Sequence, residues 1–268
     1  MWCYKLGPLL FIILINDLHP PLPTAKFVDD TTIHESFSDP KDSSLQVSTD
    51  AILQWSSNNK MQLNATKTKE ILISFKRKSE TIPRIIIDGQ EIERVDDAKL
   101  LGVNISSNLT WNTHVDTISV KASQRTYLLY RLKHSGLDPH EIISVFISII
   151  RPLLEYACQV WHTCLTVEQT HKLESFQKRA CRIAAPNLSY SDALEFFKLT
   201  PLSARREQLC KTYFEKMSQP THKLHHLLPA PKTRHHDLRA SCNLPTPRTR
   251  TERHKKSFLP YALRNFQN

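Results

Sequence analysis

The chain has 268 residues, and 40% of them are hydrophobic, so one large globular domain or two smaller ones are expected. Four glycines against sixteen prolines argue against a nucleotide-binding fold built on glycine-rich loops. The whole net charge of +10 lies in residues 203–268, which hold 14 Lys and Arg but 4 Asp and Glu, whereas residues 1–202 hold 22 of each kind. Such a basic segment favours a polyanionic partner such as nucleic acid; a solvated, partly disordered tail is the alternative.

The N-terminal segment is apolar, but it differs from a secretion signal and from a membrane span. Its apolar run from Leu9 to Ile15 ends at Asn16 and Asp17 instead of a small-residue cleavage site, and it is too short to cross a bilayer. Residues 8–18 instead predict a buried helix with Pro8 in its first turn. No membrane partner is therefore expected. The six cysteines form no C-x-x-C pair, which indicates reduced thiols of an intracellular protein that is not secreted.

The predicted elements fall into three segments. Residues 25–34 predict a strand, a turn and a second strand, with Asp29 and Asp30 at the bend. Then follow a helix over 43–63, a strand over 70–75, a hairpin over 82–95 with Asp88-Gly89 at its turn, and a strand over 98–106. Longer helices are predicted at 112–134, at 139–164 with a bend at Pro152, at 166–184 behind a capping box of Thr166 and Gln169, and at 190–218. The fold class is therefore α+β, with a short α+β segment over 1–106, a helical segment over 107–218, and a basic, partly irregular tail rich in His and Pro over 219–268.

The stretch TAKFVDDTTIHE, residues 24–35, sets two adjacent aspartates between the apolar Phe27 and Val28 and a β-favouring run. Two carboxylates at a tight bend between buried strands repel each other unless a cation shares them. A divalent ion such as Mg²⁺ prefers such hard oxygen ligands, and two-metal phosphoryl transfer needs them. From the dipeptide alone, an ordinary surface turn and half of a metal site both remain open.

Other stretches accompany this one in a fixed order. They are LGPLLFIILINDL before the aspartates, then QWSSNNKMQLNATKTKEILISF, AKLLGVNISSNLTWNTHV, IRPLLEYACQVW, LESFQKRACRI, PLSARREQL and the closing SFLPYALRNFQ. Their order and spacing resemble the end of the palm, the thumb and the C-terminal region of reverse transcriptases (RNA-directed DNA polymerases) from non-LTR, LINE-type retrotransposons. The resemblance covers nearly the whole chain from Leu6 onward. It implies a partial polymerase palm, a short antiparallel sheet with helices, in residues 1–106, and a thumb-like region in residues 107–218.

The resemblance also implies roles for individual residues. Asp29 and Asp30 match the aspartate pair that binds the catalytic Mg²⁺ ions, and Phe27 and Val28 lie on the strand that presents them. Lys67 matches a lysine that approaches the incoming deoxynucleoside triphosphate and protonates the leaving pyrophosphate; a solvated turn lysine is the alternative. Residues 101–103, Leu101, Gly102 and Val103, match the segment that steadies the 3′ end of the primer. The implied partners are an RNA template and a DNA primer. The expected location is the nucleus or the cytoplasm, and the resemblance implies action in the nucleus, because the family copies its elements into chromosomal DNA.

The chain departs from the family pattern in two places. The stretch MWCYK stands where the family has the glycine–proline–glutamine–glycine–serine segment that lines the nucleotide pocket. The family's further metal-binding aspartate and its fingers lie upstream of the matched region, and we find no counterpart of them here. We therefore expect a C-terminal half of a polymerase that is inactive alone, with residues 1–106 marginally stable because sheet edges are uncovered. A nucleic-acid-binding module that keeps only thumb-like duplex binding, and an open reading frame without function, are the alternatives.

Other groups of residues carry weaker signals. Six residues of the tail offer ligands for Zn²⁺, but their spacing matches no zinc motif, so solvated or nucleic-acid-facing side chains are favoured: His222, His225, His226, His235, His236 and Cys242. The tryptophans Trp55, Trp111 and Trp161 are expected in the core rather than as base-stacking residues. Cys158 and His162 lie four residues apart on a predicted helix, but a catalytic pair also needs an orienting third group and a pocket.

Overall fold

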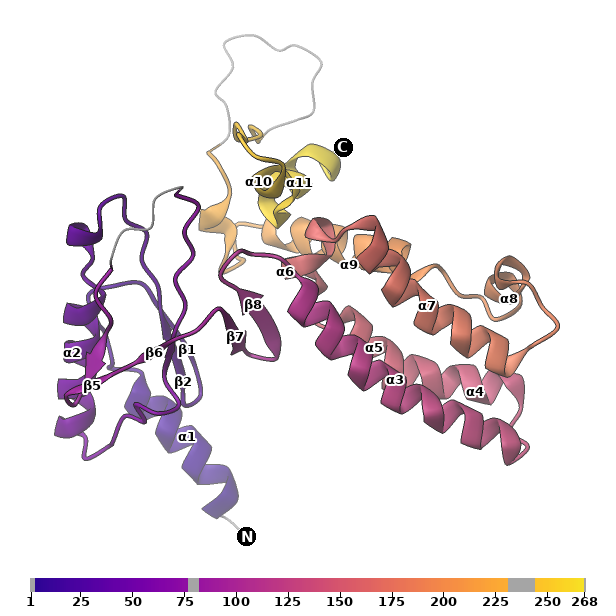
Figure 1. Cartoon of the computed structure of the whole chain (residues 1–268), viewed down its shortest axis with the longest axis horizontal. Helices are drawn as coiled ribbons and strands as arrows, with labels where there is room; N and C mark the ends of the chain where they lie inside the picture. Colours follow the sequence, from indigo (N-terminus) through magenta and orange to yellow (C-terminus); the bar gives the residue numbers. More distant parts are fainter. Residues whose placement is uncertain (1–2, 77–81, 231–243, 268) are drawn as a thin grey trace. The chain divides into compact units, whose positions relative to one another are not determined.

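The structure is a computed structural model that describes residues 3–76, 82–230 and 244–267, with side chains from Leu6 onward. The chain divides into two compact units (Figure 1). Unit 1 comprises residues 1–98 and 106–109, and unit 2 comprises residues 99–105 and 110–268. Helices and small two-stranded sheets make up the described residues, which confirms the predicted α+β class.

Unit 1 combines helices with short strand pairs. Helix α1 spans Cys3–Ile15, a 3₁₀ turn spans Pro40–Asp42, and helix α2 spans Leu45–Asn58. The strands are β1 (Thr24–Phe27), β2 (Asp30–Ile33), β3 (Lys69–Glu70), β4 (Ile86–Ile87), β5 (Gln90–Glu91) and β6 (Glu93–Arg94). Strands β1 and β2 form one antiparallel hairpin and β4 and β5 another, whereas β3 pairs with β6 in parallel. Both predicted hairpins and the helix α2 are thus confirmed.

Three predictions for unit 1 are wrong. Helix α1 begins at Cys3, so Pro8 lies inside it; a proline this close to the helix start removes only the bond to an early carbonyl, and the apolar run continues the helix. The helix is also not buried, because the core of unit 1 takes only its last turns, and Leu9 and Ile13 are 54% and 63% exposed. The strand predicted over 70–75 is reduced to Lys69–Glu70, the residues that find a partner in β6.

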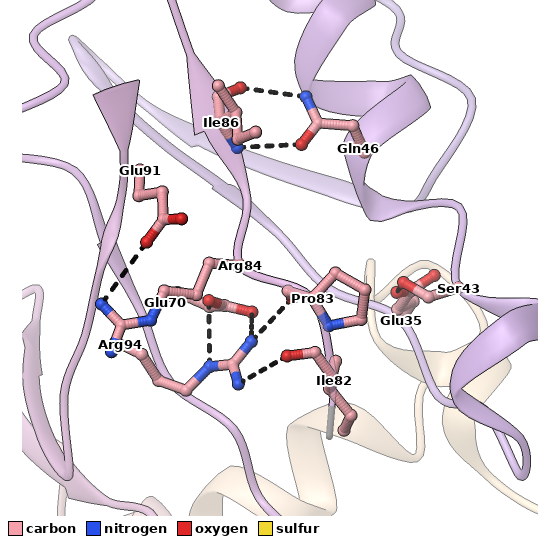
Figure 2. Close-up of polar contacts among 10 residues, drawn as sticks. All are labelled: Glu35, Ser43, Gln46, Glu70, Ile82, Pro83, Arg84, Ile86, Glu91 and Arg94. Carbon is pink, nitrogen blue, oxygen red and sulfur yellow. Dashed lines mark hydrogen bonds and ion pairs between the residues drawn. The ribbon is translucent and has the colours of Figure 1, made fainter. Parts of the chain in front are cut away.

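Two small apolar clusters and a few polar contacts hold unit 1 together. One cluster joins α1, β2 and α2, and the other joins α2 to the β4–β5 hairpin. The side-chain amide of Gln46 in α2 pairs with the backbone of Ile86 in β4 through two hydrogen bonds of 2.9 Å, as a neighbouring strand would (Figure 2). Arg94 binds both carboxylate oxygens of Glu70, at 3.0 and 3.1 Å, and the carbonyls of Ile82 and Pro83 (Figure 2). These contacts supply hydrogen bonds that the short strands lack.

The boundary between the units runs through a hairpin where we predicted one continuous strand. Strand β7 spans Asp97–Leu100 and β8 spans Val103–Ser106, so the single strand over 98–106 is wrong. The chain reverses at Leu101 and Gly102, whose φ angles are +45° and +88°. Positive φ at both central residues is the geometry of the two-residue turn that matches strand twist, and a glycine at the second position favours it.

Unit 2 is built mainly from helices around one large core. The helices are α3 (Asn112–His134), α4 (Pro139–Val145), a π-helical turn (Phe146–Ile150), α5 (Arg151–Glu155), α6 (Cys158–Trp161), a 3₁₀ turn (His162–Cys164), α7 (Val167–Ala184), α8 (Tyr190–Phe196) and α9 (Leu202–Met217). Helix α3 has the predicted bounds, and α7 begins at the predicted capping box of Thr166 and Gln169. The core includes Trp111 and Trp161, as expected of these tryptophans.

The helix predicted over 139–164 is interrupted twice. Pro152 has no amide hydrogen and its ring crowds the carbonyl four residues before it, and the chain accommodates it with a π-helical turn just upstream. The second break lies at Tyr156 and Ala157, where Ala157 has a φ of +50°. Pro152 alone therefore explains only the first of these breaks.

The helix predicted over 190–218 is also two helices, because residues 197–201 leave the helical conformation before Pro201. A buried carboxylate stabilises the new helix start: Glu174 of α7 accepts hydrogen bonds from the amides of Leu202 and Ser203, both at 3.1 Å, and from the hydroxyl of Tyr190. This carboxylate serves as the N-cap that Pro201 does not provide.

The tail ends in ordered structure. A 3₁₀ turn spans His225–Leu227, and helices α10 (Glu252–Lys256) and α11 (Phe258–Asn265) follow. Helix α11 packs its Ala262 and Leu263 against Phe214 of α9. Among the described residues, no helix is long and apolar enough to cross a membrane.

Candidate active site

The two aspartates lie at the tip of the β1–β2 hairpin. The pairing runs from Thr24 with Ile33 to Phe27 with Asp30, which leaves Val28 and Asp29 as the two-residue turn. Val28 has a φ of +54°, a conformation that a β-branched residue rarely adopts and that stores strain. The prediction of a hairpin with the aspartates at its bend is confirmed, with Asp29 in the turn and Asp30 opening the second strand.

A lysine that the sequence analysis did not single out attaches this hairpin to α1. The Nζ of Lys26 in β1 donates hydrogen bonds to the carbonyl of Ile15 at 2.8 Å and to that of Leu18 at 2.9 Å. The last carbonyls of a helix have no partner inside the helix and carry partial negative charge, so a cation there is favourable. In β1, Lys26 stands at a half-buried position between two exposed ones, and the sequence around it gives no sign of the contact with α1.

The end of the hairpin is exposed rather than buried between strands. Phe27 is 60% exposed and Val28 47%, and Asp29 and Asp30 are exposed as well. Our expectation of carboxylates enclosed by buried strands was therefore wrong for unit 1. A two-stranded hairpin has no neighbouring strands to cover the residues at its tip, so both carboxylates remain open to solvent and to an incoming ligand.

Lys67 belongs to a separate turn of unit 1. The side-chain oxygen of Asn64 accepts hydrogen bonds from the amide of Lys67 at 3.0 Å and from the hydroxyl of Thr66 at 2.7 Å, and the backbone carbonyl of Asn64 also accepts from the amide of Lys67 at 3.2 Å. The side chain of Lys67 is exposed. Among the described residues, no hydrogen bond or ion pair joins Lys67 to either aspartate of the hairpin.

The third group of predicted site residues lies at the β7–β8 turn of unit 2. Val103 is buried in the core, while Leu101 is 43% exposed. The hydroxyl of Tyr156 donates to the carbonyl of Leu101 at 2.9 Å, and a Cβ on Gly102 would lie 3.3 Å from the ring of Tyr156. The positive φ favours glycine here, and the tyrosine ring leaves little room for a Cβ. Tyr156 is a second residue that sequence reasoning missed.

Similarity to known proteins extends over this whole arrangement. The RNA-directed DNA polymerase from the Drosophila melanogaster mobile element jockey is 23% identical over 97% of this chain, which corresponds to 29% of that polymerase. Probable RNA-directed DNA polymerases from the D. melanogaster transposons X-element and BS are each 23% identical over 66% of the chain and over 20% and 21% of their own lengths. The chain is similar to non-LTR retrotransposon reverse transcriptases. It spans less than a third of the relatives it matches, and no family model and no solved structure matches it.

The sequence resemblance led us to expect Mg²⁺ at the aspartate pair, and the pair offers only part of what such an ion needs. Carboxylate oxygens are the ligands that Mg²⁺ prefers, and both Asp29 and Asp30 are accessible. However, no three His, Cys, Asp or Glu side chains come together as a metal site anywhere in the described part of the chain. The pair can therefore provide some ligands of a metal ion, and the remaining ones would come from other groups.

The other candidate groups do not form sites comparable to those of a reverse transcriptase. His225 contacts the carbonyl of Met217 at the end of α9, and His226 contacts that of Lys223 in the tail. His235, His236 and Cys242 lie outside the described residues. Cys158 is fully buried, and its thiol is hydrogen-bonded to that of Cys210, a contact that lowers the pKa of Cys158. A buried thiol beside a second thiol lacks the access that a catalytic nucleophile needs.

Proposed function

We propose that this chain is part of an RNA-directed DNA polymerase of a non-LTR retrotransposon. The observation that carries the proposal is the β1–β2 hairpin with both aspartates at its exposed tip, in a chain that matches such polymerases over 97% of its length. In this proposal unit 1 contains the end of the palm, and the helices of unit 2 form the thumb. The partners are an RNA template, a DNA primer and deoxynucleoside triphosphates, and the site of action is intracellular.

In the proposed function, Asp29 and Asp30 hold Mg²⁺ together with ligands from outside the hairpin. When bound, the metal supplies charge stabilisation for phosphoryl transfer from a nucleoside triphosphate. The exposed side chain of Lys67 contributes a positive charge for the triphosphate, and its turn is held rigid by Asn64. The β7–β8 turn contacts the 3′ end of the primer, with Gly102 allowing the close approach of neighbouring groups.

We further propose that these 268 residues do not polymerise alone. Two carboxylates supply too few ligands for a two-metal site, and the apolar side chains of α1 lie exposed where more of a polymerase would cover them. The test is primer extension by the purified chain on an RNA template with Mg²⁺ or Mn²⁺. No extension is expected, and template-dependent synthesis by the chain alone would contradict this part of the proposal.

A chimaera tests the function itself. In it, this chain replaces the matching segment of the jockey polymerase, and primer extension is expected to depend on the aspartates. The variant Asp29→Asn/Asp30→Asn should abolish extension, whereas the matched control Asp39→Asn/Asp42→Asn, on exposed aspartates of the same unit, should keep it. Equal extension by both double variants would refute the assignment of the active site.

A nucleic-acid-binding module is the second candidate function. It is supported by unit 2, which has a large core of its own and carries basic side chains along exposed helix faces. In this case, binding to a primer–template duplex should weaken steeply as salt rises, because bound phosphates release counterions. Binding that does not change with salt would count against it.

A further inference from the structure

Helices α3 and α7 of unit 2 lie side by side (Figure 1). Together they expose basic and aromatic side chains. Three contacts fix how these helices run. The Nε2 of Gln169 donates to Asn112 at 2.7 Å, Lys172 pairs with Asp116 at 2.5 Å, and the Nζ of Lys133 donates to the carbonyl of Ala184 at 3.2 Å. Since residue numbers rise together along both helices, α3 and α7 run parallel.

The outward face of α3 combines apolar and cationic groups. Val120, Gln124, Tyr127 and Arg131 follow one another at helical spacing along its exposed line. Val120 is 58% exposed, Tyr127 63% and Tyr130 45%. A helix normally turns such side chains inward, so two open tyrosine rings within one turn of each other are unusual for a face that meets only water.

The charges on this face are almost all positive. Asp116 is the acidic residue of α3, and it is paired with Lys172. Helix α7 exposes His171, Lys172, Lys178, Arg179 and Arg182 after the single exposed acid Glu168, while its other acid, Glu174, is buried. A polyanion is therefore the ligand that fits the charge of this surface.

Helical spacing places cationic side chains of α7 and aromatic side chains of α3 on the sides of the two helices that face each other. Arg179 lies seven residues, or about two turns, after Lys172, and therefore on the side of α7 that faces α3. Tyr130 lies fourteen residues, about four turns, after Asp116, on the side of α3 that faces α7. Arg131 lies next to Tyr127, with its Nη1 3.5 Å from the tyrosine hydroxyl.

We infer that this α3–α7 surface binds single-stranded RNA, with bases stacked on Tyr127 and Tyr130 and phosphates contacted by Arg131 and Arg179. Open aromatic rings between cations match unpaired nucleotides, because a duplex hides the faces of its bases. The inference rests on the proposed function, in which the single strand that an RNA-directed polymerase handles is its unpaired template. It adds a surface and a binding mode that are separate from the aspartate hairpin.

The test measures fluorescence anisotropy of the full chain with a labelled, unstructured RNA of about 20 nucleotides, and with the same strand annealed to complementary DNA. The single strand should bind more tightly than the duplex. Tyr127→Ala/Tyr130→Ala should weaken binding of the single strand about tenfold for each ring removed, whereas Tyr127→Phe/Tyr130→Phe should restore it. Arg131→Ala/Arg179→Ala should reduce the slope of log affinity against log salt by about 1.4, which the tyrosine variants should leave unchanged.

Matched controls lie on other exposed parts of unit 2. Phe196→Ala removes a half-exposed ring, and Lys198→Ala/Lys216→Ala removes two exposed charges, so neither should alter binding. Wild-type affinity in both the tyrosine and the arginine double variants would overturn this inference and leave the proposed polymerase function standing. Equal or tighter binding of the duplex would also overturn it. Failure of the chain to bind any nucleic acid at low salt would overturn it too, and the chimaera experiment would then decide the polymerase function separately.

Discussion

Acid should destabilise unit 2 through His162, whose side chain is 9% exposed. Its Nδ1 accepts a hydrogen bond from the Nε of Arg206 at 3.3 Å, and its Nε2 lies 3.2 Å from a carboxylate oxygen of Glu207. This arrangement fits a neutral ring with its proton on Nε2, because a proton on Nδ1 would face the guanidinium. Burial, and then the charge of Arg206, lower the pKa of His162 to about 4. The Glu207 carboxylate favours the charged ring, but its side chain is 36% exposed, so water screens it.

The sign and size of the effect follow from the two pKa values. In the unfolded chain the pKa of His162 is about 6.5, so as pH falls the unfolded state takes up the proton first. The contribution to stability is therefore fully present above pH 6.5 and is lost progressively between pH 6.5 and 4. The full shift corresponds to at most about 3 kcal/mol, and about 2 kcal/mol of it should be lost between pH 7 and pH 5.

Urea unfolding followed by circular dichroism measures this loss. The variant His162→Gln keeps one hydrogen-bond acceptor and one donor but does not titrate. Subtracting its free energy of unfolding from that of the wild type at each pH therefore removes the contribution of the carboxylates, which both proteins share. The difference between wild type and variant should fall by about 2 kcal/mol from pH 7 to pH 5. The matched variant His134→Gln, on an exposed histidine, should show a much smaller change. If the difference in free energy of unfolding between wild type and His162→Gln stays constant with pH, or grows as pH falls, the reasoning is refuted.

Three other predictions address the helix cap, the hairpin turn and local stability. Glu174→Gln should lower the free energy of unfolding by about 2 kcal/mol, because charge-assisted bonds to the start of α9 are lost, while exposed Glu168→Gln should not. Val28→Gly should relieve about 1 kcal/mol of backbone strain and so raise the midpoint temperature of thermal unfolding. Val28→Ala keeps a Cβ and should not raise it. Equal midpoints for the two variants would exclude strain as the cause. Amide hydrogen exchange should be faster in residues 24–33 than in the buried face of α3, and equal protection would contradict the marginal stability expected of unit 1.

Features set by neighbouring residues were predictable from the sequence. The turn at Asp88-Gly89 and the capping box of Thr166 and Gln169 appear where expected, because each depends on a few adjacent side chains. The bounds of α3 were also predictable, since apolar residues such as Val115, Ile118, Ala122 and Leu129 recur at helical spacing. The aspartate hairpin belongs to the same class, with turn and strands signalled by local residue types.

Features set by distant contacts were not predictable. The helix break at Tyr156 has no local signal comparable to Pro152, and it places the tyrosine hydroxyl on a carbonyl 55 positions earlier in the chain. The start of α9 is capped by Glu174 of another helix, and the hairpin is attached to α1 by Lys26. In each case one side chain satisfies backbone groups far away in sequence, and periodicity carries no information about such pairs.

The large apolar core and the proposed catalytic residues lie in different units. The large core lies wholly in unit 2, whereas the clusters of unit 1 centre on three buried residues each. Yet unit 1 carries the carboxylates and Lys67, and its aspartates are presented by a two-stranded hairpin, a structure that is marginal in isolation. Contacts such as the one between Lys26 and α1 therefore matter more here than an equivalent hydrogen bond would in unit 2. In the proposed function, a metal site at this tip would need further groups beside the hairpin, and the exposed apolar side chains of α1 offer a surface against which such groups could pack.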